Sequence, residues 1–331
     1  MMDLTLIWAF IIAFAVFAYV VMDGFDLGIG ILFPVLAEGE ERDKAMNSIA
    51  PVWDGNETWL VLGGGALMAA FPLAYAILIP AIYTPVIAML VGLIFRGVAF
   101  EFRWRTARGR RAWDMAFCGG SALAALAQGI ALGAILQGVR VAGRNYAGGW
   151  WDWLSPFSLL TGVALVAGYA LLGSCWLILR TEGRLQAKAF RLAALLGPAT
   201  LLGIGAVSLA TPFLHYAYYQ RWFAWPSVLA TAQVPLLVAI AVALFALSLK
   251  RRYERAPFLI ALAIFALCFM GLGISFYPYI VPPVVTLWQA AAAHSTQVFA
   301  LVGVVIFLPV ILAYTGYAYW VFRGKVSGGY H

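Results

Sequence analysis

The chain has 331 residues, of which 64% are hydrophobic and 11% charged, and its formal net charge is +7. A soluble domain carries about 25% charged residues, so this composition, with a mean hydropathy of +0.92, excludes an ordinary water-soluble protein. Apolar runs of about 20 residues without period-2 alternation predict membrane-spanning helices and exclude a β-barrel. The positive charge does not indicate a nucleic-acid partner, because the arginines lie in short loops between the apolar runs.

The apolar runs predict a single all-α integral membrane domain with nine spans. The expected spans are residues 4–36, 51–71, 73–95, 115–137, 157–180, 192–214, 225–249, 257–276 and 296–322. The first run is too long for one perpendicular crossing, so we expect it to tilt or to extend beyond the membrane near residues 23–30. It has no basic region or small-residue cleavage site before it, so we expect a retained span and not a removable signal.

The distribution of Lys and Arg predicts the orientation. Eighteen of the 21 basic residues follow odd-numbered spans, and only Arg140, Arg144 and Arg221 lie on the opposite side. By the positive-inside rule, the N-terminus is then outside and the C-terminus is cytoplasmic, which requires an odd number of spans.

Five acidic residues lie inside or beside the first three spans, all towards the expected cytoplasmic side. They are Asp23, Asp26, Asp54, Glu57 and Glu101. Ionisable groups are costly in a bilayer unless they face protein or water, so each is a candidate for function, and desolvation favours the neutral carboxyl that a proton relay uses. The spacing i, i+3 puts each of the first two pairs on one helix face.

Other residues near these acids supply supporting candidates. Asn56, Arg96 and Arg103 are close to the acids in span order and could hold a file of water. The alternative is that buried hydrogen bonds or an arginine pair merely lock the first three spans together, and that Glu101 and Arg103 form a plain interfacial ion pair. Trp53 and Trp59 flank the second acidic pair, and Trp59 either lines an apolar gas path or packs as an ordinary buried indole.

Gly24 and Gly28, four residues apart, offer a flat face for close helix contact.

The sequence offers few ligands for a redox centre or metal. The histidines His215, His294 and His331 lack helix-spaced partners, which favours interfacial polar residues over haem ligands. We therefore expect no metal site and no redox centre in this chain. Cys118, Cys175 and Cys268 lie in apolar runs, so we expect buried thiols and no disulfide.

Several motifs occur in one order over about nine-tenths of the chain. They are Asp23-Gly-Phe-Asp-Leu-Gly-Ile-Gly30, Asn47-Ser-Ile-Ala-Pro-Val-Trp-Asp-Gly-Asn56, Phe95-Arg96 with Phe100-Glu-Phe-Arg103, Leu136-Gln-Gly138, Pro156-Phe157 with Leu160-Thr-Gly162, and Tyr277-Pro-Tyr-Ile-Val-Pro-Pro283. With these motifs the chain resembles subunit II of the cytochrome bd-type quinol oxidases, the smaller and haem-free subunit.

The resemblance implies two four-helix bundles plus one extra helix, with residues 1–138 forming the first bundle and residues 157–331 the remaining five helices. It implies a pseudo-symmetric heterodimer with subunit I in the bacterial cytoplasmic (inner) membrane. That complex oxidises quinol, reduces dioxygen to water and takes up protons from the cytoplasm, with haem b and haem d held by subunit I.

The resemblance also assigns roles to residues. It places Asp54 in a proton route and Trp59 beside an oxygen route, and Glu101 stands where some relatives have Asp. It allows a small single-helix accessory subunit, and a structural quinone or lipid on this chain.

Two other functions remain open on the residues alone. One is a proton-coupled secondary transporter, although the Pro-rich break in residues 277–283 lies at an outer end and not at the midplane where transporters bind substrate. The other is a purely structural scaffold.

Overall fold

The structure is a computed structural model that describes residues 3–106 and 108–326. The helices are α1 (Leu4–Leu32), α2 (Glu40–Asn47), α3 (Trp53–Ala70), α4 (Pro72–Ala81), α5 (Tyr83–Arg105), α6 (Arg110–Leu136), α7 (Pro156–Arg180), α8 (Gly183–Ala210), α9 (Tyr216–Phe223), α10 (Val228–Thr231), α11 (Gln233–Lys250), α12 (Ala256–Phe276), α13 (Leu287–Ala290) and α14 (His294–Val321). Two short 3₁₀ helices, η1 (Phe33–Val35) and η2 (Thr211–Phe213), follow α1 and α8.

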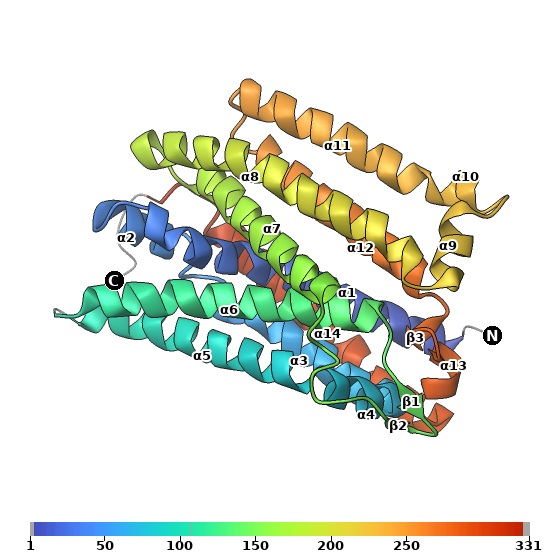
Figure 1. The fold of residues 1–331 in the computed structure, drawn as a ribbon. Coiled ribbons are helices and arrows are strands. Elements are labelled where there is room, and N and C mark those ends of the chain that lie inside the picture. The colour runs from blue at the N-terminus through green and yellow to red at the C-terminus, as the bar shows by residue number, and fades with distance from the viewer. Residues whose placement is uncertain (1–2, 107, 327–331) are drawn as a thin grey trace.

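Eight helices in the described part of the chain are long and apolar enough to cross a membrane. They are α1 with η1, α5, α6, α7, α8 with η2, α10 with α11, α12 and α14. The long helices lie side by side along a common direction (Figure 1). The prediction of an all-α membrane protein is confirmed in its coarse form, since the described residues are nearly all helical, whereas the predicted number of nine spans is not confirmed.

The second and third expected spans differ most from the sequence prediction. The second corresponds to α3, which is not among the eight candidate spans. The third, expected at residues 73–95, is divided at Ile82 into α4 and α5. Pro85 has no N–H to bond to the carbonyl four residues earlier, which explains the break. Arg96, expected near the end of a span, thus lies within α5, which continues to Arg105.

The first and last described residues lie at opposite ends of the helical array (Figure 1). At one end, the Trp288 indole donates a hydrogen bond of 2.7 Å to Asp3. At the other end, Lys325 forms an ion pair of 2.8 Å with Glu254, in the loop between α11 and α12.

Two small hairpins lie at the end of the array where α1 begins (Figure 1). In one, β1 (Val141–Ala142) pairs antiparallel with β2 (Asn145–Tyr146). In the other, β3 (Tyr279–Val281) pairs antiparallel with β4 (Val285–Thr286).

Small residues bring the central helices into close contact. A Cβ at Gly28 of α1 would overlap the backbone of α7 at Tyr169, and a Cβ at Gly173 of α7 would overlap the backbone of α1. Gly24 faces the Tyr169 ring, where a Cβ would lie 2.8 Å from a ring carbon. The prediction that Gly24 and Gly28 form a contact face is confirmed, and this contact fixes the half of α1 that carries Asp23 and Asp26.

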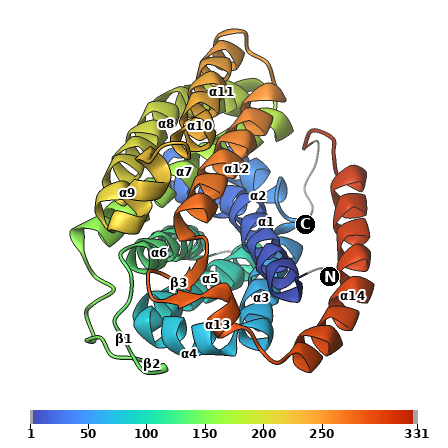
Figure 2. The same ribbon diagram turned by 90° about the vertical axis from the view of Figure 1, so that its right-hand side faces the viewer.

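By contrast, α14 lies at the edge of the molecule (Figure 2). Gln297 is its buried residue in the described part of the chain. A helix so exposed in the isolated chain must be covered by lipid or by another protein.

Candidate functional site

Helices α1, α3 and α5 bring four ionisable or polar groups of the apolar interior together. Asp23 and Asp26 of α1 and Arg96 of α5 are fully buried, and Asn56 of α3 is 1% exposed. Glu57 of α3 completes the group, with 31% of its side chain exposed. We call these five residues the acid cluster.

One guanidinium faces three carboxyl groups in the acid cluster. Arg96 Nη1 lies 2.9 Å from Asp23 Oδ1 and 3.6 Å from Glu57 Oε2, and Arg96 Nη2 lies 3.8 Å from Asp26 Oδ2. Few directed hydrogen bonds satisfy these charges. Within the described residues, neither carboxyl oxygen of Asp23 and none of the Arg96 side-chain nitrogens has a hydrogen bond of suitable geometry.

The charge balance of the acid cluster favours bound protons. One guanidinium can neutralise one carboxylate, and a further buried carboxylate would be an uncompensated charge in a medium of low dielectric constant. Buried carboxyls therefore favour the protonated form. A proton relay uses carboxyl groups in such an environment, and that role for the acid cluster stays a prediction.

Asn56 connects the acid cluster to α14. Its amide nitrogen donates hydrogen bonds of 2.7 Å to Asp26 Oδ2 and 3.3 Å to the Met22 carbonyl. Its amide oxygen accepts a hydrogen bond of 2.9 Å from the Tyr319 hydroxyl. Tyr319 is half-buried, so this line of polar atoms runs from the buried Asp26 towards the surface of the chain.

The structure leaves two of the five predicted acids outside the acid cluster. Asp54 and Glu101 are both exposed on the isolated chain. At 100° per residue, Asp54 lies about 200° around α3 from Asn56, and Glu101 lies about 140° around α5 from Arg96. Asp54 and Glu101 therefore do not join the buried group in this chain alone, and a role for them in a proton route stays a prediction.

Asp54 and Glu101 nevertheless lie in one region of the surface. Each follows one member of the stacked pair Trp53 and Phe100, whose ring centroids are 4.9 Å apart. The Arg96 guanidinium carbon lies 5.7 Å from the Trp53 ring, which puts this region next to the acid cluster. Trp53 thus contacts both Phe100, which precedes Glu101, and Arg96 of the acid cluster.

Trp59 is buried and packs mainly against α1. It is 2% exposed and meets Phe14 edge to face at a centroid distance of 5.7 Å. This packing is the usual fate of a buried indole. An oxygen route beside Trp59 stays a prediction.

Arg103, the other predicted supporting residue, belongs to a separate group about two helical turns further along α5, near the end of that helix. It lies 2.5 Å from Asp114 and 2.7 Å from Asp43, and both contacts are hydrogen bonds. Arg42 donates to Asp114 at 2.7 Å and Arg110 to Asp43 at 2.9 Å. We call these five residues the salt-bridge cluster. The sequence reasoning missed Asp43 and Asp114, although the position of Asp114 directly before an expected span could have indicated a role.

A second missed group extends from Asp23 along α1. Tyr19 lies one helical turn before Asp23 and accepts a hydrogen bond of 2.8 Å from the Gln128 amide of α6. The Gln128 carbonyl accepts another, also of 2.8 Å, from Tyr169 of α7. Gln128, a polar amide in the middle of the expected span 115–137, was the feature of the sequence that could have indicated this group.

The histidines and cysteines lie apart from the acid cluster. His215 Nε2 is 2.9 Å from the Gln137 carbonyl, and His294 is the exposed first residue of α14. His331 lies outside the described residues. Cys118, Cys175 and Cys268 are free thiols. In the described ranges, no group of three or more His, Cys, Asp or Glu side chains has the arrangement of a metal site.

Comparison with known families gives a match over almost the whole chain. The family described as cytochrome bd terminal oxidase subunit II matches residues 4–322.

Individual relatives agree with the family match. The chain is 32% identical to the cytochrome bd-I ubiquinol oxidase subunit 2 of Escherichia coli K12, over 98% of this chain and 95% of the relative. It is 28% identical to the cytochrome bd ubiquinol oxidase subunit 2 of Bacillus subtilis, over 97% and 96% of the two chains. Its fold is similar to a chain in the structure of the bd oxidase from Geobacillus thermodenitrificans, with a TM-score of 0.75, 18% identity and coverage of 97% of this chain and 99% of that one.

Proposed function

The chain belongs to the family of cytochrome bd terminal oxidase subunit II, and from this membership we propose that it lines a proton route of the oxidase. As a subunit II it is part of a membrane oxidoreductase complex with subunit I, and it is a multi-pass membrane protein. In the proposal, the complex oxidises quinol, reduces dioxygen to water and takes up protons from the cytoplasm in the bacterial inner membrane.

In this proposal haem b and haem d are held by subunit I. His215 fits haem ligation poorly, because its Nε2 lies within hydrogen-bonding distance of the Gln137 carbonyl. The redox chemistry is therefore assigned to the partner, and the residues of this chain handle protons.

The observation that carries the proposal is the ratio of three carboxyl groups to one guanidinium in the acid cluster. Asp23 and Asp26 exchange protons through the half-exposed Glu57, and Asn56 holds Asp26 in place. Asp54 and Glu101 receive protons at the exposed region beside Trp53 and Phe100, which we assign to the cytoplasmic side or to the contact with subunit I.

The membrane arrangement belongs to the same proposal. The helices α3 and α4 together make the second crossing, so the chain crosses nine times with its N-terminus outside and its C-terminus cytoplasmic. The position of the first and last described residues at opposite ends of the array supports this arrangement. The division into a bundle of residues 1–138 and a second part of residues 157–331 stays a prediction, as do an accessory subunit and a bound quinone or lipid.

The transporter alternative shares the protonatable acids but has no support among the relatives, which are named as oxidase subunits.

The proposal is tested by Asp26→Asn in the complete oxidase, measured as quinol-driven oxygen consumption per haem. Removing one protonatable group from the route should slow turnover about tenfold or more while the haem absorption spectrum is unchanged. Glu182→Gln serves as the matched control, because Glu182 is an exposed acid in the loop between α7 and α8. Equal turnover of Asp26→Asn and wild type would reject the proton role.

Asp54→Asn in the same assay tests the proposed entry. Turnover should fall less than in Asp26→Asn, because an exposed carboxylate can be bypassed by water. A scaffold role for these acids predicts instead that both variants alter the amount of assembled oxidase and leave turnover per haem unchanged.

A further inference from the structure

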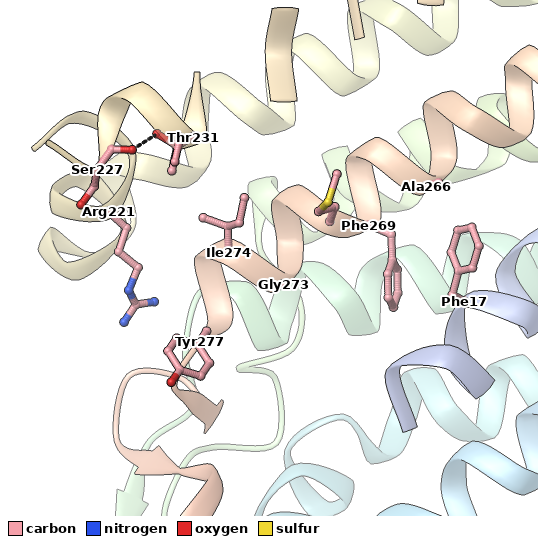
Figure 3. Close-up of a pocket in the computed structure, with 11 residues that line it drawn as sticks. Phe17, Arg221, Ser227, Thr231, Ala266, Phe269, Gly273, Ile274 and Tyr277 are labelled. Atoms are coloured by element: carbon pink, nitrogen blue, oxygen red, sulfur yellow. Dashed lines mark hydrogen bonds between the residues drawn. The ribbon is translucent and has the colours of Figure 1, made fainter. Parts of the chain in front are cut away.

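An apolar groove opens between α12, α1 and the segment from α9 to α10 (Figure 3). Its volume is about 790 Å³, within the range of about 300–1,000 Å³ that is usual for small-molecule sites. Its floor is made by apolar residues of α1 and α12. They are Phe17, Ala266, Phe269, Met270, Gly273 and Ile274.

The polar side chains of the groove gather at one end. Arg221, Ser227 and Thr231 lie there, whereas Phe17 and Phe269 lie at the other end (Figure 3). The polar end is the end of the helical array that holds β3 and β4, since Arg221 lies 5.7 Å from the Tyr279 ring of β3. The groove therefore has one charged end, and the rest of it is apolar.

Arg221 has N–H donors that are available to a ligand. It donates one hydrogen bond, of 2.5 Å, to the carbonyl of Ser275 in the last turn of α12, which satisfies a helix-end acceptor. An arginine has five N–H donors in a fixed fork that matches carboxylate and phosphate oxygens. Among the described residues no carboxylate forms an ion pair with Arg221, whereas Arg140 at the same end is paired with Asp152 at 2.9 Å.

A cation at one end of an apolar groove in a membrane protein favours a ligand that has both a negative charge and an apolar chain. A phospholipid with an anionic headgroup meets both requirements, because its phosphate can accept from the guanidinium while an acyl chain lies on the apolar floor. A quinone has no negative charge, so it would leave the guanidinium without a counter-ion.

We propose that this groove binds an anionic phospholipid, with the phosphate on Arg221 and an acyl chain between α1 and α12. The hydroxyl of Ser227, which is exposed at the same end, adds a second donor for the headgroup. The inference does not depend on the proton route, since the groove and the acid cluster share no residue.

The experiment is native mass spectrometry of the complete oxidase complex after exchange into vesicles of phosphatidylglycerol and phosphatidylcholine. Wild type should retain phosphatidylglycerol in preference to phosphatidylcholine. Arg221→Gln should lower the occupancy about tenfold or more, as expected for loss of a hydrogen bond between charged groups. Arg144→Gln is the charge-matched control from the same end of the molecule and should retain the lipid.

A second variant fills the groove without disturbing the fold. A Cβ at Gly273 meets nothing within 4 Å, so Gly273→Leu adds a side chain to the groove where there is space for it. Gly205→Leu in α8 is the matched control, because Gly205 also has open space and lies outside the groove. Gly273→Leu should lose the bound lipid, and Gly205→Leu should keep it.

Three outcomes of these experiments would overturn the proposal. Retention of phosphatidylglycerol in Arg221→Gln would show that the headgroup does not contact Arg221. Retention in Gly273→Leu would show that the lipid lies elsewhere. A retained mass equal to that of a quinone, lost in the same two variants, would assign the groove to a neutral ligand.

Discussion

The acid cluster and the salt-bridge cluster are both built on α5, yet their charges are arranged in opposite ways. In the salt-bridge cluster, three guanidinium groups meet the carboxylates of Asp43 and Asp114 through hydrogen bonds of 2.5–2.9 Å. In the acid cluster, Arg96 lies 2.9–3.8 Å from three carboxyls, and its nitrogens donate no hydrogen bond of suitable geometry to the described residues.

Under our proposal, this difference separates a structural role for the salt-bridge cluster from a proton-handling role for the acid cluster. Cations in excess, with directed hydrogen bonds to Asp43 and Asp114, fix the helices at that end. Carboxyls in excess, in a buried site with one cation, favour bound protons that can be exchanged. Both clusters contain an arginine of α5, so their place on this helix does not distinguish them. The ratio of acidic to basic side chains distinguishes them.

The largest effect is expected for Arg96→Gln. Removing the single cation from a buried charged group typically destabilises a protein by about 3–5 kcal/mol, because the remaining charges are uncompensated. The thermal unfolding midpoint of the complex and the yield of assembled oxidase should both fall sharply. The double variant Arg96→Gln with Asp23→Asn should recover part of the loss. An unchanged midpoint in the single variant would show that Arg96 does not compensate the acids.

A smaller loss of stability is expected for Arg103→Gln. Arg42 still pairs with Asp114 and Arg110 still pairs with Asp43, so each acid keeps one cation. Because the Gln amide can keep one of the two hydrogen bonds, the free energy of unfolding should fall by about 1.5–3 kcal/mol, the value for one hydrogen bond to a charged group. Turnover per assembled enzyme should equal that of wild type. Slower turnover with normal stability would remove the distinction between the two clusters.

The sequence predicted the first of these clusters better than the second. The motif around Asp23 and Asp26, and the glycines at 24 and 28, stand out because polar and small residues are rare in apolar runs. Arg103 was recognised, but its partners Asp43 and Asp114 lie outside the expected spans, where acidic residues are ordinary. The contact between Arg103 and Asp43, which are 60 positions apart, has no local signal in the sequence.

Which acids are buried could not be predicted either. Asp54 and Asn56 are two residues apart, and the rotation of α3 about its axis, set by packing against α1, buries one and exposes the other. Helix ends were also uncertain: the break at Ile82 moved the start of α5 to Tyr83, and the continuation of α5 to Arg105 placed Arg96 inside that helix.

The smallest effect is expected for Tyr319→Phe. This change removes the hydrogen bond of 2.9 Å to Asn56 and keeps the ring that packs against Trp176. A single hydrogen bond contributes about 1 kcal/mol, so a slight decrease in the unfolding midpoint is expected, with the same haem content. Tyr317→Phe is a matched control, because Tyr317 is an exposed tyrosine of the same helix. Equal midpoints for both variants would show that Asn56 does not hold α14 to the acid cluster.

The central claim, that the acid cluster holds protons, is tested most directly by infrared spectroscopy of the carboxyl groups in the complete oxidase at neutral pH. The wild-type enzyme should show a C=O band of protonated carboxyls that weakens in Asp26→Asn and is unchanged in Glu182→Gln. Identical spectra for wild type and Asp26→Asn, with Asp26 ionised throughout, would contradict the account.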